Sequence, residues 1–271
     1  MKKKMIGLLL ALTLLAGCGG AQSPAPGPER TEPPAAERVG VVCRIVDGAE
    51  DGSLMLAGQG DYPEVYRLTV GDKPVFVDGE AATAADLRDG MLVEVVTDGD
   101  VLASYPAQFS QVYELRAVSE GVDDVCGLLL EVMDTLWGED DALNHEATMA
   151  GIYLPESIPV TGADGRPRPL NTAERGAVIW RFGETHGVEP LSGSWQGLAD
   201  AGYINEAELY WEDGVYLSVE PAETVETLEG YMHFSAQKWR GGLGAIFYTD
   251  CTARRAADGS WSWEPGGFAI A

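Results

Sequence analysis

Hydrophobic and polar positions alternate in short runs between residues 39 and 118. The runs are rich in β-branched residues, and the turns between them contain Asp-Gly pairs, typical of β-hairpins, at 51–52, 78–79 and 98–99. A helical segment at 83–90 precedes the last strands, because Thr83 suits an N-cap and Gly90 a helix stop. This order predicts a small β-barrel of OB-like type, although another small barrel or a sandwich would give the same pattern.

The period of the pattern changes at SEGVDD, residues 119–124, where we place the boundary of a second domain. Apolar residues then fall on most sides of a helical pattern over 125–137, which predicts a buried central helix. A second helix is expected to begin at Asn171, in an Asn version of the capping box, and to end near Gly187. A third, short helix is expected after Ser194.

Strand-like alternation returns from residue 208 onward. The pair Asp213-Gly214 predicts a hairpin, and further strand segments follow up to the C-terminus. Helices followed by strands indicate a domain in which the helices pack on one face of an antiparallel sheet. The whole chain is therefore predicted to be α+β, with an OB-like barrel at 39–118 and an α+β domain at 122–271.

The N-terminus has the features of a bacterial export signal. Three lysines precede an apolar segment, Met5–Ala16, that is too short to span a bilayer, which needs about 20 apolar residues. Its end, LAGC at 15–18, resembles the lipobox of bacterial lipoproteins. That resemblance implies a signal peptide at 1–17 and a lipid-anchored mature N-terminus at Cys18. A plain secretory signal, with Cys18 lost or left free, is the alternative.

Residues 18–38 are rich in Pro, Ala and Glu and are predicted to be a disordered tether. The protein is then expected on the outer face of a bacterial cytoplasmic membrane, held there by lipid. The formal net charge of −25 repels phosphate backbones and anionic lipids, so we expect no nucleic-acid binding and membrane contact only through Cys18. The expected partner is an unidentified protein or small-molecule ligand.

Three cysteines remain after Cys18, namely Cys43, Cys126 and Cys251. An odd number allows at most one internal disulfide, and Cys126 with Cys251 is the pair that shares a predicted domain. Buried free thiols that act as small hydrophobic groups are favoured over that disulfide. The chain has no Cys or His spacing typical of zinc proteins, so neither a metal nor a cofactor is predicted.

Five stretches resemble segments of uncharacterised two-domain lipoproteins of Firmicutes, of clostridial type: DLRDGMLVEV, YPAQFSQVYELR, WRFGETHG, GYINEAELYWEDG and QKWRGGLGAIFYTDC. The resemblance covers most of the chain. It implies a lipoprotein of a Gram-positive-type envelope, and it brings no assigned activity and no functional residues.

The candidate chemistry of the chain is sparse. The three histidines show no metal-binding spacing and the serines no GxSxG elbow, so no catalytic residue is assigned. An enzyme hypothesis would have to use Cys251 or the acidic pair Glu212 and Asp213. RGGLG at 240–244 is too short for a phosphate cradle and indicates a turn or bulge.

Weak candidates for ligand binding are Trp261, Trp263 and His233. The two tryptophans are spaced by two, so on a strand they share one face and could offer an exposed aromatic pair, although indoles more often build a core. We therefore predict a membrane-anchored extracytoplasmic lipoprotein that acts as a ligand- or protein-interaction module. The alternative is a cell-envelope enzyme, hydrolytic or thiol-dependent, that acts through the C-terminal domain. A structural spacer without a concave pocket is the third hypothesis.

Overall fold

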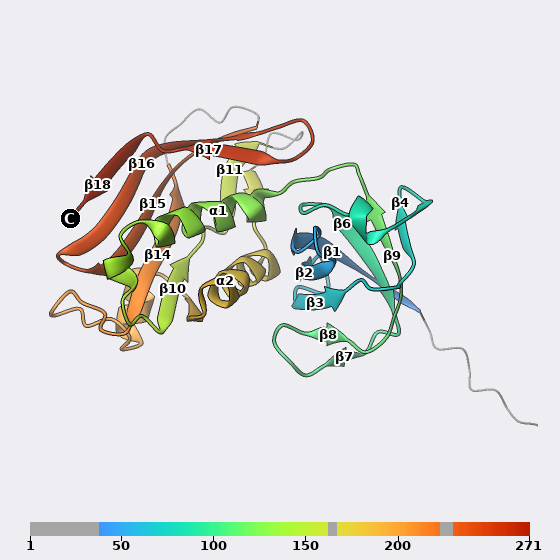
Figure 1. The fold of residues 1–271 in the computed structure, drawn as a ribbon, viewed down its shortest axis with the longest axis horizontal. Helices are drawn as coiled ribbons and strands as arrows, with labels where there is room; N and C mark the ends of the chain where they lie inside the picture. The colour runs from blue at the N-terminus through green and yellow to red at the C-terminus, as the bar shows by residue number, and fades with distance from the viewer. Residues whose placement is uncertain (1–37, 162–166, 223–229) are drawn as a thin grey trace, which may run out of the picture. The chain divides into compact units, whose positions relative to one another are not determined.

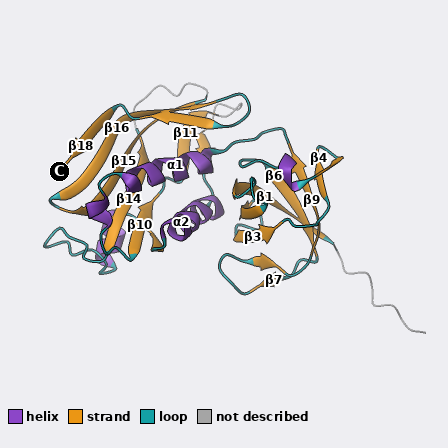
Figure 2. Cartoon of the chain, viewed as in Figure 1, coloured by secondary structure: helices purple, strands orange, loops and turns teal. Residues whose placement is uncertain are grey.

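The computed structural model describes residues 38–161, 167–222 and 230–271. The predicted signal peptide, the tether and Cys18 lie outside the described residues. Strands dominate one part of the chain, whereas longer helices occur only in the other part of what is described (Figure 2). We call residues 39–118 the first region and residues 122–271 the second region. Together they are a mixed α+β structure, as the sequence predicts.

Seven strands of the first region form one sheet in the order β3-β2-β1-β6-β9-β4-β5 (Figure 1). Its strands are β1 (Val39–Asp47), β2 (Ser53–Gly58), β3 (Val65–Thr69), β4 (Val75–Val77), β5 (Glu80–Ala82), β6 (Leu92–Thr97) and β9 (Val112–Val118). The short strands β7 (Val101–Leu102) and β8 (Gln108–Phe109) pair only with each other. All pairs in the seven-stranded sheet are antiparallel except β4 with β9.

The sheet of the first region is open. Its strand order has two ends, β3 and β5, and the pairings among the described residues do not close a barrel. Two of the Asp-Gly signals are confirmed as hairpin turns, and at Asp78-Gly79 both residues have positive φ, as a tight hairpin requires. The predicted helix at 83–90 is shorter than expected, because only the 3-10 turn η1 (Ala84–Asp86) forms before Leu87 becomes extended.

The second region contains three α-helices, α1 (Val125–Gly138), α2 (Thr172–His186) and α3 (Trp195–Asp200), and the 3-10 helix η2 (Asp141–Asn144) among its described residues. Its main sheet has the order β13-β10-β14-β15-β16-β17, and β18 also pairs with β16. These strands are β10 (Met149–Tyr153), β13 (Glu189–Ser192), β14 (Gly214–Pro221), β15 (Tyr231–Gly241), β16 (Gly244–Arg255), β17 (Trp261–Glu264) and β18 (Gly267–Ile270). A separate ribbon pairs β11 (Ser157–Thr161) with β12 (Pro167–Pro169).

The helix ends follow the sequence signals. The side chain of Asp124 caps α1 by accepting a hydrogen bond from Gly127 N. In α2 the side chain of Asn171 accepts from Glu174 N at 2.7 Å, and Glu174 Oε2 accepts from Asn171 N at 3.0 Å. Gly187 ends the helix with φ 67°, a left-handed conformation that glycine adopts without strain. The predicted capping box is therefore confirmed.

Two predictions for the second region are wrong. Its sheet is mixed rather than antiparallel, because β10 runs parallel to both β13 and β14. A parallel pair needs a long crossover, and α2 provides it between β10 and β13. The hairpin expected at Asp213-Gly214 does not form, since β14 begins at Gly214 and the Asp213 carbonyl instead accepts hydrogen bonds from Thr148 N and Met149 N.

The helices cover both faces of the sheet, which corrects the expectation of one covered face. Residues of α1 and α2 share a core with Leu217 and Val219 of β14, whereas α3 packs with Trp211 and Tyr216 on the other face. Trp211 is fully buried above Gly214, where an added Cβ would lie only 2.0 Å from the indole. The glycine therefore makes room for the tryptophan.

The first region shares part of its core with α2. Leu54 and Leu56 of β2 point into the first region's own core, while Met55 and Ala57 join the core formed by α1 and α2. Alternation along β2 therefore buries both faces of this strand. No helix among the described residues is long and apolar enough to cross a membrane.

Candidate functional site

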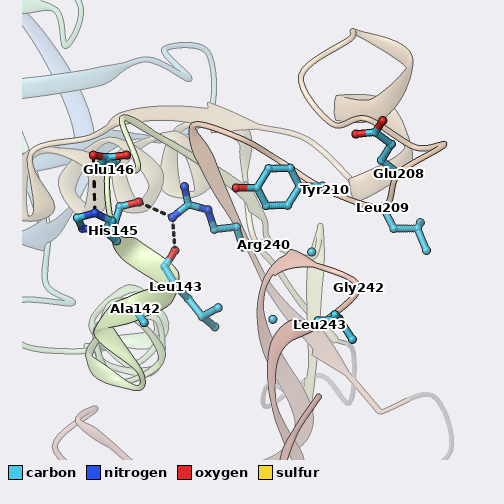
Figure 3. A pocket seen from close by; sticks show the side chains of 12 residues that line it. Ala142, Leu143, His145, Glu146, Glu208, Leu209, Tyr210, Arg240, Gly242 and Leu243 are labelled. Carbon is cyan, nitrogen blue, oxygen red and sulfur yellow. Dashed lines mark hydrogen bonds and ion pairs between the residues drawn. The ribbon is translucent and has the colours of Figure 1, made fainter.

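A cleft of about 680 Å³ opens at the tip of the β15–β16 hairpin (Figure 3). Three segments far apart in the sequence meet there: the end of η2 with the residues after it, the irregular segment before β14, and the hairpin itself. The lining residues are Ala142, Leu143, His145, Glu146, Glu208, Leu209, Tyr210, Arg240, Gly241, Gly242, Leu243 and Gly244. The volume lies in the range of about 300–1,000 Å³ that small-ligand pockets occupy.

Arg240 ties these segments together. Its Nη1 donates to the carbonyl of Leu143 at 3.0 Å and to the carbonyl of His145, and its Nη2 donates to the carbonyl of Glu212 at 2.6 Å. Both Nη atoms therefore donate to backbone oxygens, while the buried Nε has no partner among the described residues, and we assign the side chain a positioning role. Figure 3 shows the contacts to Leu143 and His145 beside the ring of Tyr210.

Glycines let the hairpin and the irregular segment approach closely. Tyr210 forms an isolated antiparallel bridge with Gly241, and Gly242 N donates to the Leu209 carbonyl at 2.8 Å. A Cβ on Gly241 would lie 3.0 Å from the Tyr210 ring, so a larger residue would push the ring away. The predicted turn or bulge at RGGLG is confirmed, and its glycines shape one wall of the cleft.

The rim of the cleft exposes large apolar side chains. Leu243 is 98% exposed at the hairpin tip, and Leu209 and Tyr210 are 50% and 43% exposed beside it. Single exposed apolar residues are common, but several together on one cleft are typical of an interaction surface.

The backbone of the rim is strained at two lining residues. Glu146 and Leu209 have φ values of 59° and 49°, in the left-handed region that non-glycine residues seldom adopt. Such conformations persist only where the surrounding structure holds them, and they concentrate at functional sites. The hydrogen bonds of Arg240 and of the Leu209 carbonyl supply that restraint here.

The cleft carries two exposed carboxylates, Glu146 and Glu208, at separate points of its lining (Figure 3). Glu146 Oε1 lies 3.7 Å from Nε2 of the exposed His145, and no ion pair joins Glu208 to another described residue. Both Nη atoms of Arg240 already donate to backbone carbonyls, so the exposed charged side chains of the lining are the two carboxylates, beside the imidazole of His145.

The structure places the predicted tryptophan pair against the core rather than in the cleft. Trp261 and Trp263 do share one face of β17, but both are half-buried. Trp261 Nε1 donates to Asp123 Oδ1 at 2.9 Å, while the Trp263 ring packs against Phe234 and Tyr248. The interpretation of the two rings as an exposed pair is therefore not supported by their positions.

His233 lies apart from the tryptophans. On β15, His233 pairs with Thr252 of β16. On β17, Trp263 pairs with Ala253, the neighbour of Thr252 on β16. Paired residues share a face and neighbours along a strand do not, so His233 and Trp263 occupy opposite faces of the sheet. The structure does not bring these ligand-binding candidates together.

The possible disulfide between Cys126 and Cys251 is not formed, and the favoured expectation of buried free thiols is confirmed within the described part of the chain. Both side chains are buried in the shared apolar core, where a thiol behaves as a small hydrophobic group. Burial raises the pKa of the Cys251 thiol above its usual value, which opposes thiolate formation. The side chains of Glu212 and Asp213, the other enzyme candidates, are exposed.

A buried ion cluster lies where the first region meets β12 and α2, and we call it the ionic junction. It consists of Arg44, Asp123, Arg168 and Glu174. Glu174 Oε1 accepts from Arg44 Nε at 3.1 Å and from Arg168 Nη2 at 2.7 Å, and Asp123 Oδ2 accepts from Arg168 Nε at 2.6 Å. Two positive and two negative charges balance among these four residues. Asp123 also accepts a hydrogen bond from Trp261 Nε1, and Nη1 of Arg255 lies 4.0 Å from its Oδ2 at the edge of the cluster.

Lys238 is a further buried charge. It is fully buried, and its Nζ donates to the carbonyls of Trp137, Glu139 and Asp140 at the end of α1. Burial lowers the pKa of Lys238 to about 8. A cation at the C-terminal end of a helix satisfies carbonyls that lack helical partners, so Lys238 serves the fold.

The parts of the chain that the structure describes contain no group of three or more His, Cys, Asp or Glu residues arranged to hold an ion. Comparison with protein-family models, with curated proteins and with solved structures gives no match. Sequence reasoning missed the cleft. One sequence feature could have indicated it. Leu243 stands between glycines at a predicted turn, where a large apolar side chain cannot reach a core and is therefore exposed.

Proposed function

We propose that this protein is a membrane-anchored extracytoplasmic lipoprotein whose second region binds a partner at the cleft around Arg240. The anchor rests on the sequence alone, on the lysines, the apolar segment and the LAGC pattern that ends at Cys18. Two or three acyl chains on that cysteine would hold the chain at a membrane without help from its acidic surface.

The observation that carries the binding function is the apolar rim of the cleft. Leu243, Leu209 and Tyr210 are exposed together, on segments held in place by Arg240 and by backbone hydrogen bonds. A rigid, preorganised apolar surface loses little entropy on binding, which is how interaction sites gain affinity. The structural-spacer hypothesis predicts no such concavity.

The remaining sequence-based hypotheses stay predictions. A cell-envelope enzyme would need a thiol other than the buried Cys251 or would have to use the exposed Glu212 and Asp213. An OB-like ligand face in the first region would need a barrel beyond the open sheet described above. The resemblance of the quoted segments to Firmicute lipoproteins is in keeping with the proposed location.

Site-specific photo-crosslinking in intact cells tests the binding function. A photoreactive phenylalanine analogue at position 243 is expected to give a discrete crosslinked product, and the same analogue at the exposed Val101 of the first region serves as the matched control. The product must disappear when Leu209→Ser is added. Equal crosslinking at both positions, or no product at position 243, would overturn the proposal.

The anchor is tested separately. Metabolic labelling with a fatty acid is expected to tag the protein, and Cys18→Ala is expected to abolish the tag and to release the chain from the membrane fraction. A labelled, membrane-bound Cys18→Ala variant would contradict the lipoprotein assignment.

A further inference from the structure

We propose that the cleft recognises a basic peptide segment in which a lysine or arginine stands next to an apolar side chain. The proposal rests on the proposed function, because it names the ligand class of the same site. It is carried by the two carboxylates, by the apolar rim and by the commitment of Arg240 to backbone oxygens.

The charges of the lining favour a cationic ligand. Glu146 and Glu208 are exposed in the cleft, and the described residues offer Glu208 no ion-pair partner. Arg240 cannot present its Nη1 to an anion, because Leu143 and His145 take both of its protons. An anionic ligand would therefore meet two carboxylates, while Nη1 of Arg240 is fully used, Nη2 already donates to Glu212 and Nε is buried.

Aromatic and apolar groups add a second element of recognition. The Tyr210 ring lies between Arg240 and Glu208 in Figure 3 and is 43% exposed, so a ligand cation can lie against its face. Leu243 and Leu209 offer apolar contact next to that position. A ligand with a positive head and an apolar neighbour satisfies both kinds of group.

The shape of the rim favours a peptide over an enclosed small molecule. Leu243 is 98% exposed and projects from the hairpin tip, so a ligand confined to the cavity would leave most of its surface uncovered. A chain that runs across the rim covers Leu243 and also places a side chain in the cleft. The net charge of −25 would additionally draw a basic segment toward the protein and would raise its association rate.

Matched peptides test the ligand class on the full-length chain. The probe is a fluorescently labelled, amidated nonapeptide with three Lys-Leu-Ser repeats, and its controls replace every Lys by Glu or every Leu by Ser. Fluorescence polarisation is expected to detect binding of the Lys-Leu-Ser peptide and at least tenfold weaker binding of both controls. Raising the salt concentration from 50 to 300 mM is expected to weaken binding further.

Variants locate the binding. Glu208→Gln and Leu243→Ser are each expected to weaken peptide binding at least fivefold. Glu206 is an exposed acid outside the lining, and Glu206→Gln is expected to leave the affinity within twofold of the wild type. Thermal melts confirm that all three variants fold. Equal affinity for the Lys and Glu peptides, or unchanged affinity in both cleft variants, overturns the proposal.

The outcomes separate this inference from the proposed function. If crosslinking at position 243 succeeds while the peptide series fails, the site stands and the ligand class is wrong. If both experiments fail, the binding function itself is wrong.

Discussion

Arginine and carboxylate side chains build both the ionic junction and the hairpin-tip cleft, but they are partnered differently. In the junction, Arg44 and Arg168 donate to Glu174, and every member of the cluster is at most 15% exposed at its side chain. In the cleft, Arg240 donates to carbonyls, and the carboxylates face solvent. The comparison teaches that residue type alone does not mark a site. Satisfied, buried charges hold the fold, whereas charges and apolar groups left exposed on a rigid rim are free to bind.

The largest expected effect comes from breaking the junction. Glu174→Ala would leave Arg44 and Arg168 buried without their shared carboxylate, which should lower the free energy of unfolding by about 3–5 kcal/mol. Urea unfolding measures this change. The matched control on the same helix, Glu184→Ala, removes a partly exposed pair with Arg67 and should cost about 1 kcal/mol or less. Equal losses in the two variants would show that burial of the junction does not matter.

A somewhat smaller loss is expected when the buried lysine is replaced. Lys238→Met should lower the free energy of unfolding by about 2–3 kcal/mol, because the carbonyls at the end of α1 lose a charged donor. Thermal and urea unfolding provide the measurement. Lys73→Met, which removes a lysine bonded to exposed backbone, should change stability by about 0.5 kcal/mol or less. A stable Lys238→Met variant would refute the capping role.

The helix cap between the two regions should respond to pH. Burial, together with the nearby carboxylates of Asp89, Asp123 and Asp47, raises the pKa of Asp124 to about 7 from its ordinary 3.8. Between these values the folded chain holds a proton that the unfolded chain has released, so this contribution to stability is lost as the pH rises from 3.8 to 7.

Asp124→Asn isolates that contribution, because asparagine also caps helices. Relative to the wild type, the variant should gain about 1–2 kcal/mol at pH 8 and change little at pH 4, after allowance for solvent screening. Urea unfolding at both pH values gives the difference. The same gain at the two pH values would mean that ionisation of Asp124 plays no part.

The smallest effect concerns backbone strain at the cleft. Leu209→Gly should leave stability unchanged or raise it by about 0.5–1 kcal/mol, because glycine adopts the positive φ of this position without strain. Leu243→Gly is the matched control. It should lower stability slightly, since Leu243 has no positive φ to relieve and glycine adds freedom to the unfolded chain. Thermal melts measure both changes in stability. A Leu209→Gly variant that is less stable than Leu243→Gly would show that the backbone at Leu209 is not strained.

Local sequence signals predicted what depends on neighbouring residues. The capping box at Asn171, the glycine stop at Gly187 and the strands up to the C-terminus all appear, because caps and alternation act over a few positions. The strand β10 was missed since it is short and contains Gly151. Its partners β13 and β14 lie far along the chain, and Gly151 packs against Trp211, which is 60 positions later, so neither contact is a local property.

The candidate sites failed for the same reason. Trp261 lies on the face that its spacing predicts, but its role follows from Asp123, which is 138 positions earlier in the chain. The cleft depends on three segments that lie far apart in the sequence and share no pattern. Arg240 holds them together through backbone carbonyls, and every residue type has such a carbonyl, so the sequence does not show which ones it bonds. The exposed Leu243 becomes part of a candidate binding surface only because the other two segments lie beside it.

If the hairpin-tip cleft binds the peptide and the junction only supports the fold, affinity and thermal stability should respond to different substitutions. Affinity for the Lys-Leu-Ser peptide, measured at 15 °C beside a thermal melt, tests this expectation in two variants. Leu243→Ser should lose at least fivefold in affinity with an unchanged melting temperature, whereas Trp261→Phe should melt several degrees lower with unchanged affinity, because it loses the bond to Asp123. Lost affinity in a folded Trp261→Phe variant, with full affinity in Leu243→Ser, would contradict the account.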